Sequence, residues 1–208
     1  MASGPTPSQD SHNTVQGETR SEITIKRSVF IGCCRHVASK ADALAYVDEL
    51  RAEFYDAVHH CWAYRLGQDG LDYRAVDDGE PSGSAGKPIL FAMQKAEISD
   101  AIVVVVRYFG GIKLGVGGLA RAYAEAASAA LTIAPRAVIT KTQPYTVFCT
   151  YDDIAKVTLL LEELRLPYRP TYADAVSFDV DVPDSMVTEL QAEVIERTAG
   201  RGGASMRH

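Results

Sequence analysis

The pattern of apolar and polar positions predicts alternating strands and helices over the first two thirds of the chain. Residues 101–106 form an unbroken apolar run, mostly β-branched, which is typical of a central strand buried on both faces. Apolar residues recur at helical spacing over residues 40–56, and an alanine-rich segment at 119–131 favours a second helix. Residues 60–66 and 73–76 have the composition of strands.

The last third of the chain predicts a second domain. Four apolar residues between 176 and 182 alternate with polar ones, as in a strand with one buried face. The predicted order is strand, helix, strand, strand, helix and strand, over residues 145–151, 153–165, 168–173, 175–182, 185–197 and 201–207. This order is the ferredoxin-like pattern. We therefore expect two α+β domains, at residues 21–137 and 142–208, with a linker bracketed by Pro135 and Pro144.

Residues 1–20 differ from the rest of the chain in composition. They are polar and rich in Ser, Thr, Gly and Pro, and such a segment buries too little apolar surface to offset its ordering entropy. We expect a disordered tail. It lacks the apolar core of a secretory signal.

Composition and charge restrict the classes of partner. The chain has 208 residues, of which 47% are hydrophobic, and a net charge of −6. A protein that coats nucleic acid or a membrane surface is usually basic, so any nucleic-acid contact must be a local patch. No apolar run approaches the roughly 20 residues of a membrane span, and the four Cys have no CxxC spacing. We expect a cytoplasmic, reduced protein without a membrane partner.

The segment 77–88 has the composition of a binding loop. It combines three acids, three Gly and two small hydroxyls, and glycines let a ligand approach the main chain. The candidate side chains are Asp77, Asp78, Glu80, Ser82, Ser84 and Lys87. Serines and the lysine would donate hydrogen bonds, while the acids would accept them or bind a cation. The alternative is a solvated turn that caps a helix.

A second glycine-rich segment, 107–123, links the buried strand to the alanine-rich helix. Backbone N–H groups at a helix N-terminus form an anion site, and residues 101–121 contain no acid. The candidate residues for nucleic-acid or anion binding are Arg107, Tyr108, Gly110, Gly111, Lys113, Gly117, Gly118 and Arg121. Arg can bind phosphate, and Tyr108 or Phe109 could stack on bases. The alternative is a tight corner with core aromatics, and the spacing matches neither a P-loop nor a dinucleotide fingerprint.

The sequence His59-His60-Cys61 is a weaker candidate for chemistry. Adjacent strand residues point to opposite faces, so at most His59 and Cys61 could converge. Two ligands do not make a zinc site, and we expect no metal. Core positions are the favoured interpretation, and a nucleophilic Cys61 with a histidine base stays open as the alternative.

Three stretches, HCWAYRLG, DDGEPSGSAGKPIL and VVRYFGGIKLGVGGLARAY, resemble the signature of the IMPACT/YigZ family, over about residues 22–132. The resemblance implies an N-terminal two-layer α/β sandwich with a left-handed β-α-β unit, as in some ribosomal proteins and elongation factor G. It also implies a ferredoxin-like C-terminal domain. Eukaryotic members carry a further domain that binds a translational activator and restrains an amino-acid-starvation kinase. The chain is more similar to the bacterial YigZ branch, so that role is not carried over, and the family has no established catalytic residues to carry over.

These observations give three hypotheses. The first is a non-enzymatic, translation-linked regulatory protein, without a cofactor, that binds RNA or the ribosome through the Gly/Arg-rich segment. The second is an enzyme or sensor that binds a phosphorylated small molecule with a divalent cation, which requires the two glycine-rich segments to meet in space. The third is a protein-interaction module whose glycine-rich loops only shape a surface.

Overall fold

The computed structural model describes residues 10–173 and 175–207, which divide into two compact units. The first comprises residues 11–139, and the second comprises residues 140–207 with Asp10. The boundary lies between the two domains expected from the sequence. None of the helices in the described ranges is long and apolar enough to cross a membrane.

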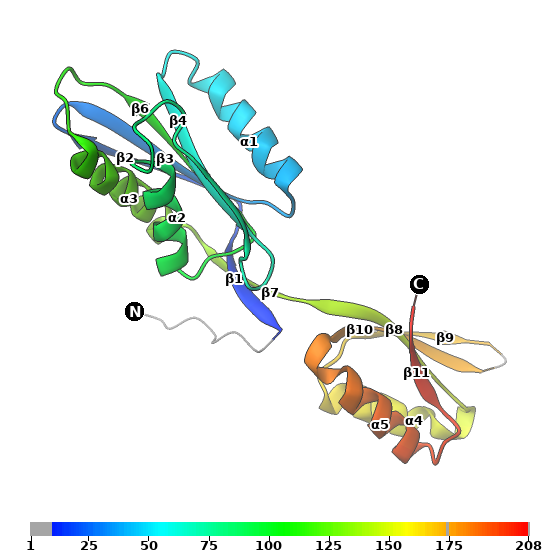
Figure 1. Ribbon diagram of the computed structural model, residues 1–208. Helices are drawn as coiled ribbons and strands as arrows, with labels where there is room; N and C mark the ends of the chain where they lie inside the picture. The colour runs from blue at the N-terminus through cyan, green and yellow to red at the C-terminus, as the bar shows by residue number, and fades with distance from the viewer. Residues whose placement is uncertain (1–9, 174, 208) are drawn as a thin grey trace. The chain divides into compact units, whose positions relative to one another are not determined.

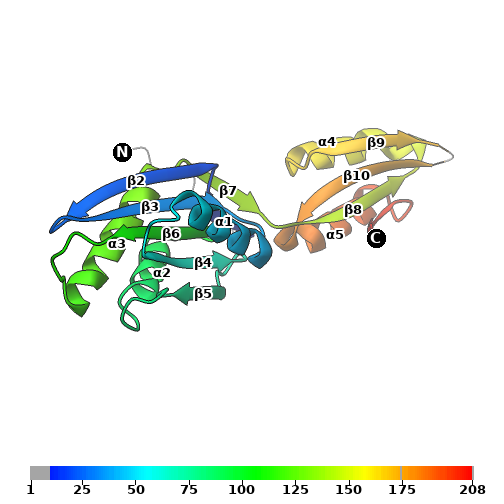
Figure 2. The same cartoon turned by 90° about the horizontal axis from the view of Figure 1, so that it is seen from above.

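The first unit is built on a five-stranded antiparallel sheet (Figure 2). In spatial order its strands are β2 (Glu18–Ile25), β3 (Ser28–His36), β6 (Ala101–Tyr108), β4 (His59–Leu66) and β5 (Asp72–Val76). The apolar run forms the middle strand β6, which confirms the predicted central strand. Strands β3 and β4 flank β6, are both antiparallel to it, and are joined through α1 (Lys40–Glu53). They form a β-α-β unit. Ser39 caps α1 and accepts a hydrogen bond from the backbone N–H of Asp42.

Helices cover both faces of this sheet (Figure 1). Helix α1 packs with Ile102, Val104 and Val106, whereas α2 (Gly86–Lys95) and α3 (Val116–Ile133) pack with Val103 and Val105. The unit therefore has three layers, not the two that the resemblance implies. The physical reason is that all six residues of the run 101–106 are fully buried, so each face of β6 needs a covering layer.

The predicted disordered tail is wrong for residues 11–20. Strand β1 (Ser11–Val15) pairs with β7 (Arg136–Thr140), and β2 begins at Glu18. The His12 ring nitrogen Nε2 lies 2.6 Å from Asp100 Oδ2, and Val15 is 2% exposed in the core. Polar side chains in this segment find partners far along the chain, which composition does not reveal. Residues 1–9 lie outside the described residues.

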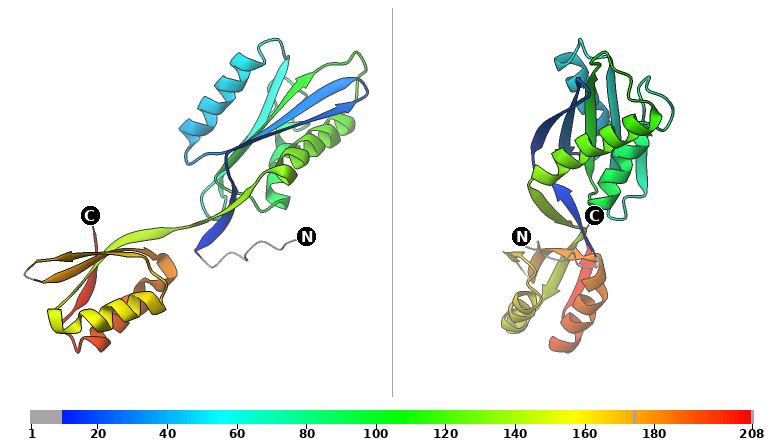
Figure 3. Two further views of the ribbon diagram at one scale, coloured as in Figure 1. Left: turned by 180° about the vertical axis from the view of Figure 1, so that it is seen from behind. Right: turned by 90° about the vertical axis from the view of Figure 1, so that its left-hand side faces the viewer.

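The second unit has the predicted strand and helix order. Its elements are β8 (Thr142–Cys149), α4 (Ile154–Glu163), β9 (Tyr168–Tyr172), β10 (Val176–Pro183), α5 (Val187–Arg197) and β11 (Gly203–Met206), with 3₁₀ turns at Tyr151–Asp153 and Asp184–Met186. The strands pair antiparallel in the order β11-β8-β10-β9, and both helices lie on one face of the sheet (Figure 3). This is the ferredoxin-like arrangement. The segment expected to be a linker is mostly strand, because β7 and β8 occupy residues 136–140 and 142–149.

Candidate functional site

The first glycine-rich segment contains the N-terminus of α2, a helix that the sequence analysis did not identify. Asp77 Oδ1 accepts hydrogen bonds from the backbone N–H groups of Ala85 (3.0 Å) and Gly86 (2.8 Å), and its Oδ2 accepts one from Gly83 (2.7 Å). Burial would raise the pKa of Asp77, but these three donors outweigh burial and lower it below its ordinary value. Asp77 therefore positions the start of α2.

This arrangement predicts a pH-dependent effect of Asp77→Asn. Because the pKa of Asp77 is lower in the folded than in the unfolded chain, its stabilisation is present above about pH 4 and is lost as the pH falls through the folded-state pKa. We expect a loss of about 1–2 kcal/mol of unfolding free energy at pH 7, and a smaller loss at pH 3. Urea denaturation followed by Trp62 fluorescence measures it, with the exposed Asp72→Asn as the control. An effect equal at both pH values would contradict this role.

Asp78 and Ser84 also serve the fold. Asp78 Oδ1 accepts from Arg51 Nη2 and its Oδ2 accepts from the backbone N–H of His60, both at 2.8 Å. The buried Ser84 hydroxyl donates to the carbonyl oxygen of Pro81 at 2.6 Å. These bonds occupy the oxygens of Asp77 and Asp78 that the second hypothesis assigned to a cation. Within the described ranges, no group of three or more His, Cys, Asp or Glu is arranged to hold a metal ion. Ser82 and Lys87 are exposed.

Glu80, the third acid of this segment, is buried and forms an ion pair with Arg107. Their side chains are 4% and 6% exposed, and Arg107 Nη1 donates to Glu80 Oε1. The Tyr123 hydroxyl donates to the same oxygen at 2.7 Å, and His59 Nε2 lies 3.9 Å from it. Burial raises the pKa of Tyr123, so its hydroxyl keeps the proton that it donates. The sequence analysis expected Arg107 to contact phosphate, whereas the structure pairs one of its terminal nitrogens inside the fold.

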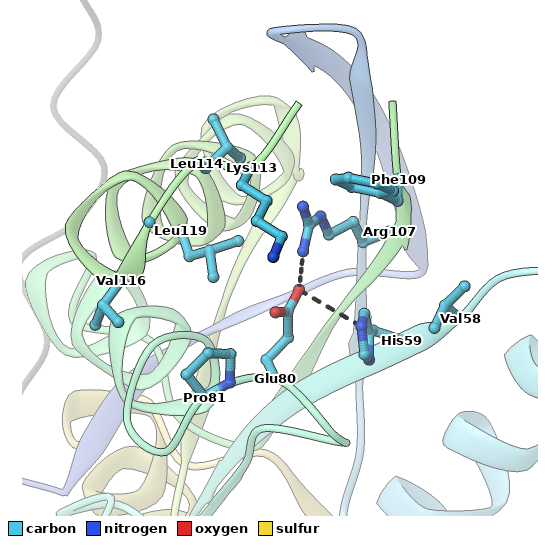
Figure 4. A pocket seen from close by; sticks show the side chains of 11 residues that line it. Val58, His59, Glu80, Pro81, Arg107, Phe109, Lys113, Leu114, Val116 and Leu119 are labelled. Atoms are coloured by element: carbon cyan, nitrogen blue, oxygen red, sulfur yellow. Dashed lines mark hydrogen bonds and ion pairs between the residues drawn. The ribbon is translucent and has the colours of Figure 1, made fainter. Parts of the chain in front are cut away.

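The two glycine-rich segments meet at a pocket with a volume of about 520 Å³. It lies between the end of β6, the start of β4, the loop before α2 and the start of α3 (Figure 4). The lining residues are Val58, His59, Glu80, Pro81, Arg107, Phe109, Lys113, Leu114, Gly115, Val116 and Leu119. The second hypothesis required this meeting of segments, although the cation of that hypothesis has no matching ligands.

The glycines of the second segment have different structural roles. Gly110 lies against the turn between β2 and β3, and a Cβ placed on it would be 2.0 Å from the carbonyl carbon of Arg27. Its N–H donates to the Ser28 hydroxyl at 3.1 Å. Gly115 is the N-cap of α3 with a φ of +70°. The other candidate glycines, Gly111, Gly117 and Gly118, lie between these two or in the first turn of α3.

The contact at Gly110 places the turn between β2 and β3 against the loop between β6 and α3. Lys26 and Arg27 form the exposed tip of the β2–β3 hairpin, which lies beside the β6–α3 loop in Figures 1 and 2. That loop and the first turns of α3 carry the exposed Lys113 and Arg121. We call Lys26, Arg27, Lys113 and Arg121 the basic edge. The sequence analysis missed Lys26 and Arg27, although two adjacent basic residues at a hairpin turn are a recognisable signal.

The two candidate aromatic residues point in different directions. Phe109 lines the pocket and is 52% exposed. Tyr108 packs with the core on the α1 side of the sheet, and its hydroxyl donates to Asp56 Oδ1 at 2.7 Å. Phe109 follows the last residue of β6 and lines the same pocket as Lys113, so it is the aromatic residue that lies with the basic edge.

Cys61 is a core residue. It is fully buried, its thiol donates to the carbonyl oxygen of Asp77 at 2.9 Å, and burial raises its pKa to about 12. The thiol is therefore protonated near neutral pH, which argues against a nucleophilic role. The other three cysteines are also free and buried.

Comparison with known proteins places both units in described families. Residues 26–131 match the model of the Impact N-terminal domain, and residues 147–201 match a domain of unknown function, DUF1949. The IMPACT family member YigZ of Escherichia coli strain K12 is 35% identical over 179 residues, which cover 85% of this chain and 88% of that protein.

Two further matches extend the comparison. A solved structure, "Crystal structure of an hypothetical protein", has a TM-score of 0.68 and 32% identity and covers 96% of this chain and 98% of that one. The "Protein IMPACT homolog" of Saccharomyces cerevisiae is 36% identical over 106 residues, which cover 48% of this chain and 40% of that protein.

Proposed function

The chain belongs to the IMPACT family, and from this premise we propose that it is a non-enzymatic, translation-linked regulatory protein that binds RNA, free or in the ribosome, through its basic edge. The link to translation is what the resemblance to this family implies. The observation that carries the proposal is the contact of Gly110 with the backbone of Arg27, which places the hairpin tip with Lys26 and Arg27 against the loop that carries Lys113 and leads into α3 with Arg121.

Electrostatics favours RNA as the ligand of this surface. Nucleic-acid affinity comes largely from phosphates neutralised by Lys and Arg, and the basic edge contributes four such exposed residues. The chain as a whole carries a charge of −6, so contact would be confined to this edge. Phe109, which is 52% exposed beside it, offers a face on which a base could stack.

The nearby polar groups support binding more than catalysis. Glu80 Oε1 is occupied by Arg107 and Tyr123, and the Cys61 thiol is buried with a pKa of about 12. A nucleophile needs a lowered pKa or an adjacent base and access to substrate. The Cys61 thiol lacks both the lowered pKa and the access.

We expect Lys26→Ala/Arg27→Ala/Lys113→Ala/Arg121→Ala to lose RNA binding. For a single strand, four phosphate contacts give a slope of about −3 in log affinity against log salt, or roughly a 50-fold loss between 50 and 200 mM salt. The fourfold variant should bind more weakly at 50 mM and show a slope near zero. Fluorescence anisotropy with a 5′-hydroxyl RNA 20-mer and ribosome co-sedimentation at both salt concentrations measure this.

The matched control removes four exposed cations elsewhere. Lys40→Ala/Lys95→Ala/Arg165→Ala/Arg169→Ala makes the same change in net charge outside the basic edge. Its RNA affinity should stay within about twofold to threefold of the wild type. Equal losses in the two variants, or wild-type binding that does not respond to salt, would contradict the proposal.

A further inference from the structure

The pocket is lined by a buried arginine, Arg107, that has an unused hydrogen-bond donor. Arg107 is 5% exposed, and its Nη1 is bonded to Glu80. Its Nε is buried without a hydrogen-bond partner in the described part of the chain, although a guanidinium has five N–H donors. A buried donor without a partner costs about 1–3 kcal/mol. An acceptor that reached this Nε would therefore recover free energy at Arg107.

The N-terminus of α3 forms one wall of the same pocket. Gly115 and Val116 line it, and this 18-residue helix has neither a side-chain cap nor an acid in its first turn. A Cβ on Gly115 would meet nothing within 4 Å, so the backbone there is open to a ligand. Free N–H groups and the helix dipole at such an end attract anions.

Two further cations lie at this end of α3. Lys113 lines the pocket, and Figure 4 shows its side chain pointing into the same hollow as Arg107 and Glu80. Arg121 turns back along α3, with Nη1 3.9 Å from the position of a Cβ on Gly117. The lining residues Arg107, Lys113 and Glu80 give a net charge of +1, and Arg121 adds a further positive charge on α3. A phosphomonoester carries about −1.5 to −2 at pH 7.

The remaining wall is apolar. Val58, Phe109 and Leu119 line it, and the volume of about 520 Å³ falls within the range of about 300–1,000 Å³ usual for small-molecule sites. A bare phosphate would leave this wall in contact with water, whereas a ligand with an aromatic or apolar body would cover it.

We propose that this pocket binds a phosphomonoester with an aromatic or apolar body. The phosphate lies at the N-terminus of α3 against Lys113 and Arg107, and the body lies against Phe109 and Val58. The ligand is either a free small molecule or the 5′-terminal phosphate of a nucleic acid, because both present the same group.

Binding of phenyl phosphate and of adenosine monophosphate to the full chain tests the proposal. We expect both to raise the melting temperature and to give saturable calorimetric titrations. Both should bind more tightly than inorganic phosphate or adenosine. Val116→Asp should weaken this binding at least tenfold, because its carboxylate occupies the N-terminus of α3, where an acid also favours the helix. Leu71→Asp, an equal change at a side chain 73% exposed outside the pocket, should change it less than twofold.

Two further variants separate this proposal from RNA binding by the basic edge. Phe109→Ala should weaken the binding of phenyl phosphate more than that of inorganic phosphate. Lys26→Ala/Arg27→Ala, which changes no lining residue, should weaken the binding of the RNA 20-mer and leave the affinity for phenyl phosphate within twofold of the wild type.

A comparison of two oligonucleotides shows which molecule supplies the phosphate. If the 5′-phosphorylated oligonucleotide binds more tightly than the 5′-hydroxyl one, and phenyl phosphate competes with it, the ligand is the end of a nucleic acid. If the two bind equally, the ligand is a free small molecule. The proposal is overturned if neither phosphomonoester binds, if inorganic phosphate binds as tightly, or if Val116→Asp has no effect.

Discussion

Replacing Glu80 with alanine should lower the unfolding free energy of the N-terminal unit by about 3–5 kcal/mol. Both side chains of the Glu80–Arg107 pair are almost fully buried, and removal of one partner leaves the other charge without compensation. Glu80→Ala also deprives the Tyr123 hydroxyl of its acceptor. Against a typical stability of 5–15 kcal/mol, this loss is large. Urea denaturation followed by the fluorescence of Trp62, the single tryptophan and a residue of β4, reports on this unit.

An exposed ion pair in the same unit gives the matched control. Arg20 pairs with Glu53, and their side chains are 40% and 46% exposed. Pairs in water contribute about 0–1 kcal/mol, so Glu53→Ala should cost less than 1 kcal/mol. The double variant Glu80→Leu/Arg107→Met should be more stable than Glu80→Ala, because it removes the isolated charge as well as its partner. If Glu80→Ala costs no more than Glu53→Ala, the buried pair is not a major determinant of stability.

Gly110→Ala should destabilise the same unit by at least about 1–3 kcal/mol, the usual cost of overpacking. The new Cβ would lie 2.0 Å from the carbonyl carbon and 2.1 Å from the oxygen of Arg27. Both are backbone atoms, which a rotamer change cannot move. The β2–β3 hairpin would have to shift, and RNA affinity should fall together with stability because Lys26 and Arg27 form its tip.

Gly117→Ala is the control, and it should change stability in the opposite direction. Gly117 is helical, and a Cβ on it would meet nothing nearer than Arg121 Nη1 at 3.9 Å. Alanine is favoured over glycine in helices by about 0.5–1 kcal/mol. Unfolding in urea should therefore require more denaturant for Gly117→Ala and less for Gly110→Ala. The same sign for both substitutions would show that steric contact with the hairpin does not decide the effect.

The fold was predicted well where the pattern is local. The apolar run 101–106 predicted the central strand β6, and the alternation between residues 176 and 182 predicted β10, because burial repeats with the period of each element. Helix α2 was missed for a specific reason. Its N-terminal N–H groups bond to Asp77, eight or nine residues before Ala85 and Gly86, whereas the usual capping pattern spans three residues.

The candidate site was predicted in composition but not in arrangement. The two glycine-rich segments do meet at a pocket, yet the three acids separate, so that Asp77 and Asp78 bond to the fold and Glu80 enters the pocket. Tyr108, the last residue of β6, packs with the core on the α1 side, whereas the next residue, Phe109, lines the pocket.

The sequence by itself determined the order and type of most elements and the two-unit organisation. Three contiguous stretches of it also indicated the IMPACT family. Only the tertiary structure decided that Arg107 pairs with Glu80, that residues 11–15 form a strand, and that Lys26 and Arg27 lie beside the loop that carries Lys113. Periodicity and turn chemistry depend on neighbours within a few residues, so they can be read along the chain. Contacts between residues tens of positions apart depend on how the sheet and helices pack, and no local pattern contains that information.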